Sequence, residues 1–114
     1  VAKDGKAYLV IGSPGGKTII NTVFQTVLGV TEYNMRVDKA IEALKIHHQW
    51  LPDRLTYEET MLSPDTRDIL KKMGHNLSKR ASLGALMGIQ FDVENGLLIG
   101  ASDSSRPDGG ASGY

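Results

Sequence analysis

The glycine-rich turn Gly12-Ser13-Pro14-Gly15-Gly16 holds the residues of this 114-residue chain best suited to chemistry. It lies between an apolar run and a stretch with helical periodicity. Glycine lacks a Cβ atom, so Gly15 and Gly16 can adopt backbone conformations closed to other residues and allow a ligand to approach closely. Successive backbone N–H groups at the start of a helix form a site for negative charge. The turn is therefore a candidate anion site.

Three kinds of anion suit such a turn: a phosphate, a carboxylate, or the oxyanion that develops during acyl transfer. A phosphate-binding P-loop is excluded, because GSPGGKT lacks the four-residue spacing between its first glycine and Gly-Lys-Thr. A strand-to-helix turn with a purely structural role is the alternative that the residues leave open.

The second notable segment is HHQWLPD, residues 47–53. Adjacent residues such as His47 and His48 point to opposite faces of a strand and diverge by about 100° on a helix. We therefore expect no shared metal ion, since His75 is the only other histidine. Trp50 is expected to be a packing anchor whose indole N–H needs a partner, with the two histidines holding the loop backbone by hydrogen bonds.

The sequence offers no recognisable nucleophile. A catalytic serine commonly lies in a Gly-x-Ser-x-Gly frame, and this frame is absent around Ser13, Ser63, Ser82, Ser102, Ser104 and Ser105. An amino-terminal nucleophile requires Thr, Ser or Cys at position 1. The chain has Val1 there.

The spacing of apolar residues predicts the strand and helices that position the glycine turn. Residues 7–11 form a short apolar run before Gly12, which predicts a strand buried on both faces. Residues 17–33 carry apolar side chains at three- and four-residue spacing, which predicts an amphipathic helix. A shorter helix is predicted over 37–44, and Pro52 favours a loop or extended chain around the histidines.

The second half of the chain gives three further predictions. Residues 55–58 alternate weakly, as a strand does. A helix is predicted from Ser63, a suitable cap, through Pro64 to Met73, with Gly74 ending it. Residues 76–79 are ambiguous.

The carboxy-terminal part is predicted to be a hairpin and a tail. Residues 87–93 and 97–101 flank Asn95-Gly96, a strong signal for an antiparallel pair. Residues 102–114 are rich in Gly, Ser and Asp, which favours a loop or disorder, with Asp103 and Arg106 placed to pair across a turn. The whole predicts one α+β domain over residues 1–114, or part of a larger one, whose strands need further partners.

Composition limits the classes of partner. Thirteen basic residues balance thirteen acidic ones, so no net charge favours nucleic acid or an anionic membrane. The chain has no cysteine, which removes disulfides and thiolate chemistry. No apolar run reaches the roughly eighteen residues that span a bilayer. We expect no cofactor, no metal, no nucleic acid and no membrane span in this segment.

Five segments, taken in order, resemble the gamma-glutamyltransferase (gamma-glutamyltranspeptidase) family, specifically the carboxy-terminal part of its small subunit. They are GSPGGKTIINTVFQTVL, KIHHQWLPDRLTYE, LSPDT, GH and GASDSSRPDGGASGY. The resemblance runs from about Gly12 to Tyr114, and the pairing of GSPGG with HHQWLPD is its specific part. It implies part of the αββα sandwich of an amino-terminal-nucleophile hydrolase.

The resemblance also implies an activity. In this family a precursor cleaves itself into a large and a small subunit, and a threonine leading the small subunit attacks the gamma-glutamyl amide of glutathione and related compounds. Gly15 and Gly16 would correspond to the pair whose N–H groups form the oxyanion hole. The threonine, a serine pair and an arginine that bind substrate precede this segment in the family. The 114-residue chain alone is therefore expected to be inactive.

The partners implied by the resemblance are the remainder of the small subunit, the large subunit and a gamma-glutamyl substrate such as glutathione. A periplasmic or extracellular location is also implied. Self-association is expected if the chain is isolated.

The chain departs from the family pattern at two places. It has Ala43-Leu44-Lys45 where the family usually has Ala-Pro-Arg before His-His, and Ser104-Ser105 where the family often has Pro-Arg. Two alternatives stay open. One is a free-standing noncatalytic module that binds a small anion or assembles with itself; the other is the same architecture acting in acylase or polyglutamate chemistry.

Overall fold

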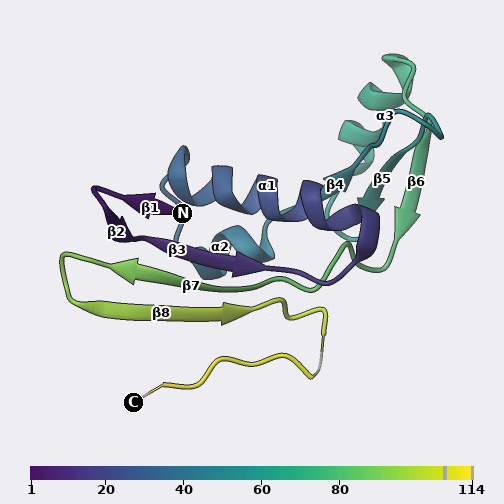
Figure 1. Cartoon of the computed structure of the whole chain (residues 1–114). Coiled ribbons are helices and arrows are strands. Elements are labelled where there is room, and N and C mark those ends of the chain that lie inside the picture. The colour runs from purple at the N-terminus through teal and green to yellow at the C-terminus, as the bar shows by residue number, and fades with distance from the viewer. Residues whose placement is uncertain (107, 114) are drawn as a thin grey trace.

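A three-stranded antiparallel sheet carries the glycine turn at the end of its first strand (Figure 1). The computed structural model describes residues 1–106 and 108–113. In the sheet, β7 (Met87–Asp92) lies between β3 (Leu9–Gly12) and β8 (Leu97–Ser102). Leu9 pairs with Gln90, and Met87 pairs with Ser102. The hairpin predicted around Asn95-Gly96 is confirmed, with Gly96 in the left-handed conformation at φ 66°.

Two helices cover one face of this sheet. α1 (Ile19–Thr31) contacts β3, and α2 (Val37–Glu42) contacts β7 and β8. Each helix is shorter than predicted, and α1 begins later because Gly16–Thr18 form a 3-10 turn, η1. The core between helices and sheet consists of Leu9, Val30, Val37, Ala40, Ile41 and Leu86. Gly88 allows the close approach of α2, since a Cβ there would lie 3.1 Å from Val37 Cγ2.

The opposite face of the sheet is exposed, so the predicted burial of the first strand on both faces is wrong. Side chains alternate across a strand. Leu9 lies in the core, while Val10 is 57% exposed. Met87, Ile89 and Leu98 are exposed on the same side as Val10. This apolar face, which we call the outer sheet face, is the face that a second sheet would cover in a sandwich.

The second sheet holds the histidine segment and the capped helix. Its order is β4 (Ile46–His47), β5 (Leu55–Glu58), β6 (Leu77–Arg80), with β5 and β6 parallel. α3 (Pro64–Lys72) makes the crossover, and the Ser63 side chain accepts a hydrogen bond from Thr66 N–H, as the predicted cap requires. The ambiguous segment 76–79 is thus largely strand β6. A small core of Leu55, Tyr57 and Leu62 packs here.

One hairpin was not predicted. β1 (Ala2–Lys3) pairs with β2 (Lys6–Ala7) around Asp4 and Gly5, at φ 51° and 73°. Asp-Gly is a common two-residue hairpin turn, so the signal was present in the sequence. At the other end, residues 103–106 and 108–113 lie outside helices and strands, as the composition of the tail predicts.

Candidate functional site

The glycine turn has a backbone that only glycine adopts readily. Gly15 has φ 142° and Gly16 has φ 57°, and both residues are exposed. The turn is closed by Thr18, whose N–H and Oγ1 donate to Gly15 O at 3.2 Å and 3.0 Å. A Cβ on Gly15 would lie 2.6 Å from Thr18 Oγ1. The local geometry therefore requires glycine at position 15 for space as well as for conformation.

The N–H groups of Gly15 and Gly16 are available as donors. They precede and begin the helical segment formed by η1 and α1, where the first N–H groups have no intrahelical acceptor. Among the hydrogen bonds of the described residues, neither group has an acceptor. Adjacent backbone donors at the start of a helical segment are an arrangement that can attract negative charge.

A second segment, residues 83–86, supports the turn from the side. Ala85 N–H donates to Ser13 Oγ at 3.0 Å, and Ser13 Oγ donates to Pro14 O at 2.7 Å. Gly84, with φ 85°, has no room for a Cβ, which would lie 2.7 Å from Ser13 Oγ. Ser13 thus has a structural role. Sequence reasoning missed this support, because the segment contacts Ser13 across more than seventy positions of chain, with only Gly84 as a local signal.

The two histidines make separate contacts. His47 is buried, with Nδ1 2.8 Å from Asn21 Oδ1 and Nε2 3.2 Å from Gln49 Oε1. His48 Nδ1 accepts from Trp50 N–H at 3.1 Å, as predicted for a histidine that holds the loop backbone. His47 instead bonds to side chains. In the part of the chain that the structure describes, no three His, Asp or Glu side chains are grouped as metal ligands.

Two sequence predictions near the site are wrong. Trp50 is not a packing anchor: it is 78% exposed, because the loop is held by hydrogen bonds of His48 and Gln49 rather than by burial of the indole. Asp103 does not pair with the side chain of Arg106. Its buried carboxylate lies 3.9 Å from the equally buried Lys45 Nζ, whereas exposed Arg106 meets Asp103 only through a backbone bond of 3.3 Å.

A cationic cavity of about 390 Å³ lies beside the turn. Lys17 lines it, together with Arg54, which directly precedes β5, and Lys79 and Arg80 of β6. Lys79 hydrogen-bonds to Glu59, and this bond raises the pKa of Lys79. Basic side chains around a cavity favour an anionic ligand there.

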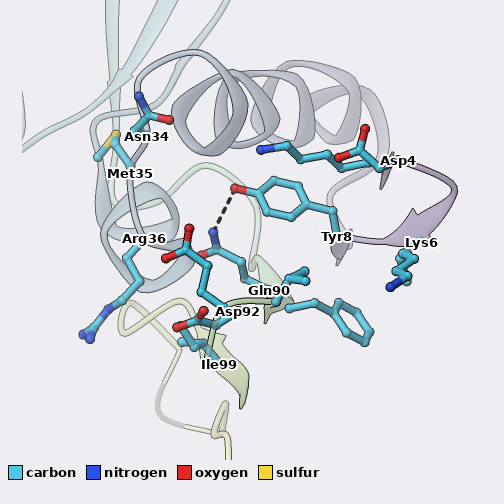
Figure 2. Close-up of a pocket in the computed structure, with 14 residues that line it drawn as sticks. Asp4, Lys6, Tyr8, Asn34, Met35, Arg36, Gln90, Asp92 and Ile99 are labelled. Carbon is cyan, nitrogen blue, oxygen red and sulfur yellow. Dashed lines mark hydrogen bonds between the residues drawn. The ribbon is translucent and has the colours of Figure 1, made fainter. Parts of the chain in front are cut away.

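A larger cavity, about 700 Å³, lies at the opposite end of β3 (Figure 2). Neither Gly15 nor Gly16 lines it. Gln90 organises it: Gln90 Nε2 donates to the Tyr8 hydroxyl at 3.2 Å, and Gln90 Oε1 accepts from Val37 N–H at 2.9 Å. Arg36 at its edge donates two hydrogen bonds to Asp38, of 2.6 and 2.7 Å. These bonds lower the pKa of Asp38 to about 2.

The Arg36–Asp38 pair gives a pH-dependent prediction. A carboxyl whose pKa falls on folding stabilises the fold above its usual pKa, near 3.8, and this contribution is lost as the pH falls towards 2. We expect Arg36→Ala to raise the Asp38 midpoint towards 3.8, as measured by NMR titration of its side-chain carboxyl. Arg80→Ala, which removes an arginine far from this pair, is the control. An unchanged Asp38 midpoint in Arg36→Ala would contradict the assignment.

The family of this chain follows from comparison with known proteins. The family model described as Gamma-glutamyltranspeptidase matches residues 1–114. The chain belongs to the gamma-glutamyltranspeptidase family. It is 42% identical over 114 residues to the glutathione hydrolase proenzyme of Escherichia coli (strain K12), covering all of this chain and 19% of that protein. The chain therefore spans about a fifth of the length of this relative.

Solved gamma-glutamyltranspeptidases share the fold. The enzyme of Pseudomonas nitroreducens, complexed with L-DON, matches with a TM-score of 0.89 and 32% identity, over 100% of this chain and 60% of that one. A mutant of the Helicobacter pylori enzyme matches with a TM-score of 0.86 and 37% identity, over 93% of this chain and 58% of that one. The predicted fold class is confirmed: the chain is α+β and part of the amino-terminal-nucleophile hydrolase sandwich.

None of the helices in the described residues combines the length and the apolar character needed to cross a bilayer.

Proposed function

We propose that this chain is the carboxy-terminal part of the small subunit of a gamma-glutamyltransferase, or glutathione hydrolase, and that Gly15 and Gly16 supply its oxyanion hole. The observation that carries the proposal is the pair of consecutive, exposed glycines at φ 142° and 57°, at the start of a helical segment. Family membership over residues 1–114 supports it.

The chemistry assigned to the pair is stabilisation of a tetrahedral intermediate. A threonine hydroxyl from outside residues 1–114 attacks the gamma-glutamyl carbonyl, and the carbonyl oxygen becomes an oxyanion. The N–H groups of Gly15 and Gly16 donate hydrogen bonds to it, which lowers the barrier because the donors are already in place. The amine then leaves with a proton, and water or an acceptor amine resolves the acyl-enzyme by the same route.

The exposed outer sheet face supports the proposal that residues 1–114 form only part of a sandwich. Val10, Met87, Ile89 and Leu98 are 57%, 53%, 42% and 67% exposed and lie on one face. A contiguous apolar face of this kind marks a contact surface. We propose that the remainder of the small subunit packs against this face and that the large subunit is a further partner.

The test compares the isolated chain with a full-length precursor that carries it after the preceding residues of the natural protein. With a chromogenic gamma-glutamyl anilide, we expect turnover by the self-cleaved precursor and none by the 114-residue chain. Turnover by the isolated chain would contradict the proposal that the nucleophile lies outside residues 1–114. If the chain is instead a free-standing module, it should unfold cooperatively as a monomer by size-exclusion and urea titration, and no threonine-led segment should precede it.

A further inference from the structure

Three charged side chains, Lys45, Glu58 and Asp103, meet in the interior at a place that the proposed reaction does not use. They are only 3%, 6% and 5% exposed. Lys45 Nζ lies 4.0 Å from Glu58 Oε2 and 3.9 Å from Asp103 Oδ2. The ammonium group also donates to the carbonyl oxygens of Ile41 and Ala43. The cluster therefore joins the end of α2, strand β5 and the segment that follows β8.

The two carboxylate residues of the cluster hold the two ends of segment 83–86. Glu58 Oε1 accepts from Leu83 N–H at 2.9 Å, in a buried hydrogen bond. Asp103 N–H donates to Leu86 O at 2.8 Å. Leu83 and Leu86 are themselves fully buried, at 0% exposure. Segment 83–86 is thus fixed at one end by β5 and at the other by the chain after β8.

The same segment supports the glycine turn. Ala85 N–H donates to Ser13 Oγ at 3.0 Å. A Cβ on Gly15 would lie 3.5 Å from Gly84 Cα, so the backbone of Gly84 lies close beside Gly15. A displacement of segment 83–86 would therefore move the turn that presents the Gly15 and Gly16 N–H groups.

We propose that the buried cluster of Lys45, Glu58 and Asp103 is a positioning device that holds segment 83–86 against the Gly15 turn and so sets the geometry of the oxyanion hole. This inference rests on the proposed function of the two glycines. None of the three side chains is assigned contact with substrate. Their effect is indirect, through Leu83, Ala85 and Ser13.

The charges explain why the cluster is sensitive to change at Lys45. Two buried carboxylates face one ammonium, and Asp103 Oδ2 is a buried oxygen without a hydrogen-bond partner among the described residues. Removing the only cation leaves two uncompensated buried charges, which is strongly unfavourable. An arginine keeps the charge and offers five N–H donors in a planar fork that suits carboxylates. Lys45→Arg is therefore the conservative variant that should preserve the cluster.

The experiment uses the full-length precursor with Lys45→Met, which keeps the length of the side chain and removes its charge. We expect kcat to fall by about tenfold or more, since small misplacements of catalytic groups are costly, and KM to change by less than about twofold. Hydrogen exchange at the amides of Leu83 and Ala85 should accelerate. Lys45→Arg should restore both properties. Lys71→Met, which removes an exposed lysine near Asp68 on α3, is the matched control and should leave both unchanged.

The outcomes separate this inference from the proposed function. If Gly15→Ala lowers kcat by about 100-fold but Lys45→Met keeps wild-type kcat and wild-type exchange at Leu83 and Ala85, the positioning role is wrong. If Gly15→Ala keeps full turnover, the oxyanion assignment is the one that fails. Should Lys45→Met not fold, Glu58→Gln provides the test, because a neutral acceptor binds Leu83 N–H more weakly. Wild-type kcat and exchange in Glu58→Gln would overturn the inference.

Discussion

Replacing Gly15 by alanine in the full-length precursor is expected to lower kcat by about 100-fold, with a much smaller change in KM, because one oxyanion-hole donor, the role proposed for Gly15, is worth about that much in turnover. The new Cβ would lie 2.6 Å from Thr18 Oγ1, so the turn must shift. The residue would also have to keep φ 142°, which side chains other than glycine rarely adopt. Both effects displace the N–H groups from the position that the oxyanion takes. Steady-state kinetics with a gamma-glutamyl anilide would measure the loss.

Gly96→Ala is the matched control for this variant. Gly96 is also left-handed, at φ 66°, and a Cβ there meets nothing within 4 Å. It lies in the turn between β7 and β8, so the backbone strain of alanine is present without a catalytic role. We expect wild-type kcat in Gly96→Ala. Equal losses in the two variants would show that strain alone, and not the position of the donors, explains the effect at Gly15.

Ile41→Ala is expected to lower the free energy of unfolding of the full-length precursor by about 2–5 kcal/mol, the usual cost of emptying a packed core position. Ile41 is a residue of α2, is 0% exposed and belongs to the core between the helices and the β3-β7-β8 sheet. Urea unfolding monitored by circular dichroism would measure the change.

Ile69→Ala on α3 provides the comparison for the core variant. Ile69 is 57% exposed, and a surface change of this kind shifts stability by less than about 0.5 kcal/mol. A similar loss in both variants would mean that the core between the helices and the β3-β7-β8 sheet does not determine the stability of the precursor.

Local signals predicted much of the fold because they depend on neighbouring residues. Ser63 and Pro64 mark the start of α3, and Asn95-Gly96 marks the β7–β8 turn; both are confirmed. The strand β6 was ambiguous because its pairing partner, β5, lies about twenty residues earlier in the chain. Strand pairing of this kind depends on tertiary contacts that a short window of sequence does not contain.

Burial was harder to predict than secondary structure. The apolar residue Trp50 is expected to be buried by its type, yet it lies on the surface. Lys45 and Asp103 are charged and expected outside, yet both are buried, because each compensates the charge of the other. Apolarity predicts burial only when a partner surface is present, and charge predicts exposure only when no counter-charge is available.

For the candidate site, the sequence alone predicted the glycine turn, because two adjacent residues without Cβ atoms between a strand and a helix are a local signal. The tertiary structure decided what surrounds that turn. Segment 83–86 and the cluster of Lys45, Glu58 and Asp103 come from positions far apart in the chain. Only packing brings them together, because the cost of burying these charges is offset only when all three meet.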